Sequence, residues 1–146
     1  MDPKVYGPNS NAVVAPYNHT VELKLVSGGG EHPFHLHGTQ FQLVERMQNA
    51  SLPHTKVTVR ENPMRRDTVI IPNGGSVTIR FRADNPGAWI MHCHMDWHLS
   101  AGLAMLLIQA PKEAKEMLKV PAYLTQQCHM QGLPVHGKAG GVRGSA

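Results

Sequence analysis

The alternation of apolar and polar residues along the chain predicts a series of short β-strands. In Val21–Val26, valine and leucine alternate with glutamate and lysine, which is typical of a strand with one buried face. Pro72–Gly75 reads Pro-Asn-Gly-Gly and predicts a turn. Further strands are expected at Phe41–Met47, Val57–Arg60, Thr68–Ile71, Ser76–Phe81, Trp89–His92 and Ala104–Gln109. Regularly spaced strands with turns between them indicate an all-β sandwich.

The pattern changes towards the C-terminus. Lys112–Leu118 and Ala122–His129 have helical character, and the glycine-rich Gly137–Ala146 is expected to be a flexible tail. At 146 residues the chain is large enough for one domain with a substantial core. We therefore predict a single sandwich domain over residues 1–111, followed by a short helical C-terminal extension and tail over residues 112–146.

Charge and hydropathy exclude two classes of partner. The formal net charge is +4, but the basic residues are scattered, and no run of lysine and arginine predicts nucleic-acid binding. The chain also lacks the stretch of about 18 apolar residues that a membrane span requires. We therefore expect no nucleic-acid partner and no membrane span in this chain.

Histidine and cysteine are concentrated in two short segments. Residues 32–38 read His-Pro-Phe-His-Leu-His-Gly, and residues 89–98 read Trp-Ile-Met-His-Cys-His-Met-Asp-Trp-His. These segments contain six of the ten histidines and one of the two cysteines. A thiolate and two imidazoles are the ligands of a blue copper, and further imidazoles suit other copper centres. The composition of the two segments therefore predicts copper as the cofactor.

The spacing of the donors places them on two faces. Successive side chains of a strand point in opposite directions, so His92 and His94 lie on one face and Cys93 on the other. His35 and His37 share a face by the same rule, whereas His32, three residues before His35, falls on the opposite side. A short helical turn at residues 96–101 would return His98 to the copper. The two sets are His32, Cys93 and His98 on one face, and His35, His37, His92 and His94 on the other.

A purely structural role is the alternative for each donor taken singly. A lone buried cysteine is usually an inert, small apolar residue, and a lone histidine is more often a satisfied polar group than a ligand. Seven donors in two motifs of this spacing argue against that interpretation. Structural zinc is also disfavoured, because such sites usually pair cysteines in Cys-x-x-Cys units, and Cys128 is distant from Cys93.

Together, the two motifs resemble the copper motifs of multicopper oxidases, the family of laccases, ascorbate oxidases and fungal iron oxidases. The resemblance extends from about Tyr6 to Gly141, includes Asn62–Asp67 and Arg82–Trp89, and is strongest to fungal members. The chain is similar to the last of the three cupredoxin domains of this family. The resemblance therefore implies a cupredoxin-like Greek-key β-sandwich.

The resemblance also implies a role for each donor. The type 1 copper would be held by His32, Cys93 and His98, the type 2 copper by His35, and the type 3 pair by His37, His92 and His94. Because Cys93 is peptide-bonded to His92 and His94, these three residues would carry electrons from one face to the other. They are accordingly the expected catalytic residues, together with Asp96.

Leu103 and Asp96 are expected to tune the two sites. In this family the axial position of the type 1 copper is ten residues after the cysteine, which is Leu103 here. Leucine cannot coordinate copper, and the loss of a weak axial ligand raises the reduction potential. Met105 is two residues too late and is assigned to the core. Asp96 is expected to orient a ligand or water near the cluster, with a helix N-cap as the alternative.

The function implied by the resemblance is the one-electron oxidation of a reducing substrate and the four-electron reduction of dioxygen to water. The cluster of this family uses eight histidines, and this chain supplies four. We therefore expect an incomplete oxidase, completed by upstream cupredoxin domains or by a partner chain. Two alternatives remain: a stand-alone type 1 electron-transfer domain, which would not need the four additional histidines, and two copies that face each other.

The reducing substrate is the least specified element. Fungal iron oxidases carry a carboxylate four residues before the first type 1 histidine, and the matching residue here is Gly28. Glu31 is adjacent to His32 and either substitutes for that carboxylate or is a solvated loop residue. A laccase-like oxidation of phenols is therefore the first expectation, with a ferroxidase or other metal oxidase as the alternative.

Glycosylation sequons and the number of cysteines predict an extracellular location. Asn18-His19-Thr20 and Asn49-Ala50-Ser51 are N-glycosylation sequons, typical of secreted glycoproteins. No signal peptide follows Met1, so we expect that the native gene product begins further upstream.

If Cys93 holds copper, Cys128 has no partner in the chain, which suggests an intermolecular or interdomain disulfide. In this family the tail commonly bonds to the first domain; a free buried thiol is the alternative.

Overall fold

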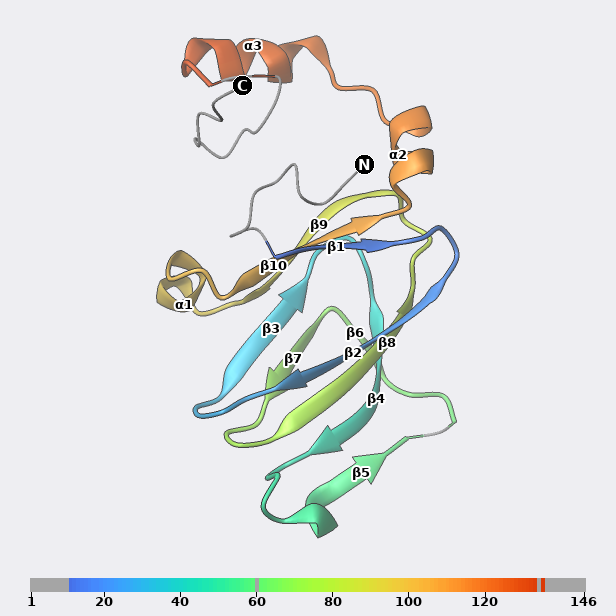
Figure 1. The fold of residues 1–146 in the computed structure, drawn as a ribbon, viewed down its shortest axis with the longest axis vertical. Helices are drawn as coiled ribbons and strands as arrows, with labels where there is room; N and C mark the ends of the chain where they lie inside the picture. The colour runs from blue at the N-terminus through green and yellow to red at the C-terminus, as the bar shows by residue number, and fades with distance from the viewer. Residues whose placement is uncertain (1–10, 60, 134, 136–146) are drawn as a thin grey trace.

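The strands form two sheets that pack face to face (Figure 1). The computed structural model describes residues 11–59, 61–133 and 135. The first sheet contains, in spatial order, β1 (Ala12–Ala15), β10 (Ala104–Gln109), β9 (Gly87–Cys93), β3 (His32–Leu36) and β7 (Thr68–Ile71). The second contains β2 (Thr20–Val26), β8 (Ser76–Arg82), β4 (Phe41–Met47) and β5 (Lys56–Thr58), with β6 (Arg65–Arg66) paired to β4. The predicted all-β sandwich is confirmed.

The chain crosses repeatedly between the two sheets. Strands β1 to β4 alternate between the first and the second sheet, and β7, β8 and β9 alternate again. All pairs are antiparallel except β1 with β10, which run parallel. As a result, β3 and β9, which are distant in sequence, lie side by side in the first sheet and carry the two histidine-rich segments.

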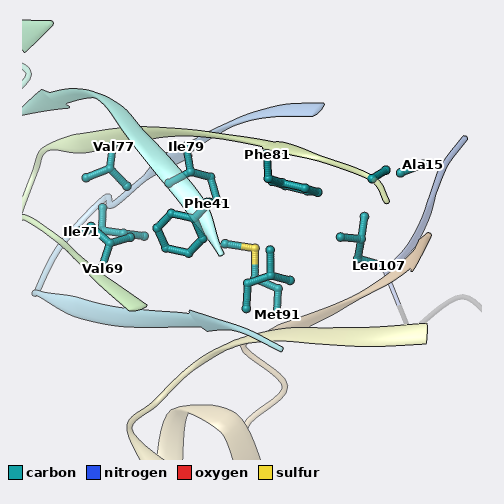
Figure 2. Close-up of a cluster of buried hydrophobic side chains, with 11 residues drawn as sticks. Ala15, Phe41, Val69, Ile71, Val77, Ile79, Phe81, Met91 and Leu107 are labelled. Carbon is teal, nitrogen blue, oxygen red and sulfur yellow. The ribbon is translucent and has the colours of Figure 1, made fainter. Parts of the chain in front are cut away.

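Apolar side chains from both sheets fill the space between them (Figure 2). Phe41, at the start of β4, is fully buried and lies among aliphatic side chains of the two sheets. In β8, alternate residues point inward, so Val77 and Ile79 are buried while Arg80 is exposed. Met91 of β9 is also fully buried, which places the core directly beside the strand that carries Cys93.

The predicted elements agree with the structure to within a few residues. The predicted bounds of β4, β7 and β10 are those observed. The predicted strand at 57–60 is too long, because β5 ends at Thr58; Arg60 lies outside the described residues. β1, β3 and β6 were not among the predicted strands, although the donors of β3 were assigned to faces by strand alternation. β1 has four residues and pairs in parallel with the distant β10, whereas β6 has only two residues, both exposed.

Three short α-helices and a 3-10 turn, η3 (Pro53–Thr55), complete the described chain. α1 (Asp96–Ser100) is the predicted helical turn, and α2 (Pro111–Met117) and α3 (Ala122–Met130) match the predicted helical extension. Neither α2 nor α3 contains a buried residue. The predicted tail at 137–146 lies outside the described residues. None of the helices in the described part of the chain has the length and apolar character that a bilayer crossing requires.

The core predicts a large effect of truncating Phe41. We expect Phe41→Ala to lower the free energy of unfolding by about 3–5 kcal/mol, because a cavity replaces a fully buried ring. Ile70→Ala is the matched control, because Ile70 lies on the outer face of β7 and is 47% exposed. The control should lose about 1 kcal/mol or less. Urea denaturation followed by circular dichroism measures both, and equal losses would contradict the packing described.

Candidate metal centre

A buried thiol and two imidazoles converge at one end of the first sheet. His32 begins β3, Cys93 ends β9, and His98 lies in α1, which turns back after the strand. The Sγ atom of Cys93 lies 3.3 Å from Nδ1 of His98 and 3.8 Å from Nδ1 of His32. The two Nδ1 atoms are 3.3 Å apart. All three donor atoms lie within 4.8 Å of one another, which is the spacing of ligands around one metal ion.

The orientation of the two imidazoles suits coordination. Nε2 of His32 is 3.0 Å from the carbonyl oxygen of Gly29, so the ring proton resides on Nε2 and the lone pair of Nδ1 faces the thiol. The indole of Trp97 lies against His98, with ring centroids 3.7 Å apart and the ring planes tilted by 54°. Cys93 is fully buried, whereas both histidines are half-buried. A soft thiolate with two imidazoles fits copper, so these residues fit the cofactor predicted from the sequence.

Leu103 is linked to Cys93 by a hydrogen bond between their backbones. The amide of Cys93 donates a hydrogen bond of 3.0 Å to the carbonyl of Leu103. Leu103 and His32 also line the same hollow of about 400 Å³, and the Leu103 side chain is 38% exposed. Met105 lies in β10, half-buried and packed against the core, as predicted. The structure therefore places Leu103, rather than Met105, beside the site formed by His32, Cys93 and His98.

Four imidazoles gather on the other side of β9. The register of β3 and β9 sets His35 opposite His92. The ring centroid of His35 lies 4.7 Å from that of His37 and 5.8 Å from those of His92 and His94. The His92 and His94 centroids are 5.4 Å apart. Nε2 of His37 is 3.2 Å from Nε2 of His92. The four rings therefore face a common space, as the alternation of side chains predicts.

Hydrogen bonds to the backbone orient two of these rings. Nδ1 of His35 lies 3.0 Å from the carbonyl oxygen of Asp67, and Nδ1 of His92 lies 2.9 Å from that of Cys93. Because a carbonyl oxygen only accepts hydrogen bonds, both Nδ1 atoms carry the proton. The lone pair of Nε2 on each ring is therefore available to a metal ion. The arrangement matches what metal-bound histidines show in general.

The cluster also affects protonation. Desolvation, and then the imidazoles of His35, His92 and His94, lower the pKa of His37 below its ordinary value. His37 is exposed, so we attribute more of the effect to the crowded imidazoles than to burial. Because its pKa is lowered, His37 remains neutral when the pH falls to the ordinary pKa of histidine. The ring therefore retains the lone pair that a metal ion needs.

Asp67, which the sequence analysis placed in neither donor set, is close to the imidazole cluster. Its Oδ1 atom lies 3.9 Å from Nδ1 of His35, and the hydroxyl of Thr68 lies 3.0 Å from the same nitrogen. A carboxylate followed by a strand is a common pattern, and only the pairing of β3 with β7 brings these residues to His35.

Other predicted residues are placed less centrally. Asp96 is exposed and is the first residue of α1, and the N-cap position is occupied by Met95 without a side-chain cap. The N-cap interpretation of Asp96 is therefore wrong. Glu31 is exposed. Cys128, in α3, is half-buried and is not bonded to Cys93.

Comparison with known proteins identifies the family. The multicopper oxidase profile matches residues 1–113. The iron multicopper oxidase fer1 of Mycosarcoma maydis is 45% identical over 152 residues, covering 99% of this chain and 24% of that protein. The crystal structure of Fet3p, described as a multicopper oxidase that functions in iron import, has a TM-score of 0.84 at 32% identity, covering 93% of this chain and 28% of that one. A laccase from Botrytis aclada has a TM-score of 0.68 at 31% identity, covering 86% and 24%.

These likenesses confirm the predicted cupredoxin-like fold. The chain spans about a quarter of the length of the relatives it matches, so it corresponds to one part of a larger oxidase. Members of this family bind copper, in agreement with the donors that converge here. On the evidence of the profile match and of a 45% identical relative, this chain belongs to the multicopper oxidase family.

Proposed function

We propose that this chain supplies the type 1 copper site and half of the histidine ligands of the oxygen-reducing cluster in a multicopper oxidase. The observation that carries the proposal is the position of Cys93. Its thiol lies within 3.8 Å of the Nδ1 atoms of His32 and His98, and its neighbour His92 lies in the imidazole cluster. A thiol that served only to fill the core would need neither contact.

The residues of the chain provide a short path between the two sites. Copper, when bound, supplies reversible one-electron chemistry at the thiolate. The peptide bonds of Cys93 join it directly to His92 and His94. A hydrogen bond from Nδ1 of His92 to the carbonyl of Cys93 adds a second connection. His32 and His98 are half-buried, so their outer edges are accessible to a reducing substrate.

The four-histidine cluster requires a partner. His37 and His94 are exposed, so the rings line an open face rather than a closed cage. Upstream cupredoxin domains of the same protein would cover this face with four further histidines and admit dioxygen to the completed site. In the same assembly, Asp96 would orient a ligand or water.

We also propose secretion, with glycans on Asn18 and Asn49 and a disulfide from Cys128 to an upstream domain.

We propose ferrous iron as the reducing substrate, with phenols as the second candidate. Iron is favoured because the iron oxidase fer1 is similar over 99% of this chain, and because Fet3p has a higher TM-score than the Botrytis laccase. This reverses the order that the sequence alone favoured. Phenols remain a candidate on one observation: no acidic residue is found among the described residues that line the hollow beside His32, where Gly28 lies.

The thiolate assignment predicts the colour of the copper-loaded chain. We expect Cys93→Ser to abolish the intense blue absorption, because that band requires a bond between copper and a thiolate. Cys128→Ser is the matched control and should remain blue, since Cys128 lies in α3 outside the cluster. Visible absorption spectroscopy measures both variants, and a blue Cys93→Ser protein would refute the assignment.

The axial assignment predicts a change of reduction potential. We expect Leu103→Met to lower the potential of the thiolate copper, because a thioether adds a weak axial donor that stabilises the oxidised ion. Met105→Leu is the control; its side chain packs against the core, so the potential should not change. Redox titration of the blue band is the measurement. An unchanged or raised potential in Leu103→Met would count against Leu103 as the axial residue.

The substrate proposal predicts a preference of the full-length protein. We expect a higher kcat/KM for ferrous iron than for a simple phenol. Gly28→Asp should raise kcat/KM for iron and leave that for the phenol unchanged, because a carboxylate beside His32 adds a ligand for Fe²⁺. A Cβ at Gly28 meets no atom within 4 Å, so the substitution fits without strain. Faster oxidation of the phenol by the unmodified protein would favour the laccase-like alternative.

A further inference from the structure

Three consecutive residues after β3 are held from β9, from β10 and from the loop that precedes β9. The amide of His37 donates to the carbonyl of Ile90 at 3.0 Å. The side-chain amide of Asn85 donates to the carbonyl of Gly38 at 2.6 Å. The side-chain amide of Gln109 donates to the hydroxyl of Thr39 at 2.7 Å. We refer to residues 37–39 as the His37 turn.

An aromatic ring supports the middle of this turn. Trp89 lies under Gly38 so closely that a Cβ on Gly38 would be 2.3 Å from Cδ2 and Cε3 of the indole. Gly38 also has a φ of +66°, which favours glycine. The indole N–H donates to the carbonyl of Asn85 at 2.9 Å, so the ring that supports the turn also fixes the asparagine that binds it. These contacts leave little freedom to the backbone of the turn.

The turn determines where the His37 ring lies. His35 and His92 each have a ring nitrogen bonded to a backbone carbonyl. Within the described residues, the His37 ring has no such bond to the backbone; its one hydrogen-bond contact is that of 3.2 Å between its Nε2 and Nε2 of His92. Its position therefore depends on the backbone that carries it. Metal sites require donors to be held to within about 0.5 Å, so a loosely held turn would misplace this donor.

Gln109 shows that a bond to the turn is kept at a cost. It is fully buried in the last position of β10, and its Oε1 atom has no hydrogen-bond partner among the described residues. An unsatisfied buried oxygen is unfavourable, and an apolar residue of the same size would avoid the penalty. The hydrogen bond to Thr39 is the contact that an apolar residue would lose.

We propose that Asn85, Trp89 and Gln109 act as positioning residues that clamp the His37 turn and thereby set His37 against His92 in the imidazole cluster. The inference rests on the proposed function of that cluster. It assigns a role to three residues that are not metal ligands and whose contacts with the chain around them hold the His37 turn rather than His32, Cys93 or His98. Loosening the clamp should therefore affect the imidazole cluster and spare the cysteine.

The clamp can be tested in the metal-free, full 146-residue chain by NMR. In the unmodified chain we expect nuclear Overhauser contacts between the rings of His37 and His92, whose centroids lie 5.3 Å apart. Asn85→Ala and Gln109→Leu should abolish these contacts. Gln109→Leu should do so without lowering the unfolding midpoint, because it removes an unsatisfied polar group. Contacts that persist in both variants, or that are missing from the unmodified chain, would overturn the proposal.

A matched variant separates positioning from general stability. Asn73 holds the loop between β2 and β3, on the side of the thiolate site. Its Oδ1 atom accepts a hydrogen bond of 2.8 Å from the amide of Gly30, which lies close to His32. Asn73→Ala should keep the contacts between His37 and His92. A loss of those contacts in Asn73→Ala as well as in Asn85→Ala would show a structural effect alone and would overturn the clamp.

Copper titration of the same proteins distinguishes failure of the clamp from failure of the proposed function. Asn85→Ala should keep the intense blue band of the thiolate site, while the affinity of the imidazole cluster for Cu²⁺ falls by about tenfold or more. Electron paramagnetic resonance monitors the imidazole-bound ion. An unmodified chain that is never blue would contradict the proposed function. A blue Asn85→Ala chain with unchanged affinity at the imidazoles would contradict the clamp alone.

Discussion

The antiparallel register of β3 and β9 is the constraint on which the site depends. It sets Phe34 opposite Cys93 and His35 opposite His92. Because successive side chains alternate, this single register sends the thiol to one side of the sheet and the imidazoles to the other. A shift of β9 by one residue would move its own donors to the opposite face, so that they no longer met those of β3. The fixed pairing of two strands therefore determines both donor sets at once.

The core of the sandwich maintains that register. Leu36 and Met91, which are partners across the two strands, are both fully buried. A slip by one residue would expose these side chains and bury polar ones, at a cost of several kcal/mol. The hydrophobic effect thus fixes the geometry of the metal-binding side chains. The thiolate site lies at the edge of the core, where Cys93 is buried and the imidazoles of His32 and His98 remain half-buried.

Much of this arrangement could be predicted from local sequence, for a physical reason. In β2 the apolar and polar residues alternate, and the exposure of the side chains alternates with them, so the buried face could be predicted from the sequence. The mainly apolar segments of β4, β7 and β10 were predicted with their observed bounds. The assignment of the donors to two faces follows from the same alternation. What could not be predicted depends on distant partners. β1 exists because it pairs with β10, and Asp67 reaches His35 only through the pairing of β3 with β7.

The open face of the imidazole cluster has a consequence for handling this chain in isolation. His37 and His94 are exposed beside His35 and His92, with ring centroids no more than 5.8 Å from His35. Several neutral imidazoles presented together are a chelating surface for nickel, zinc or copper ions. The chain would therefore be retained on immobilised-metal resin without an affinity tag. Traces of such ions would also bridge two molecules, so chelator becomes a necessary component of any buffer in which its oligomeric state is measured.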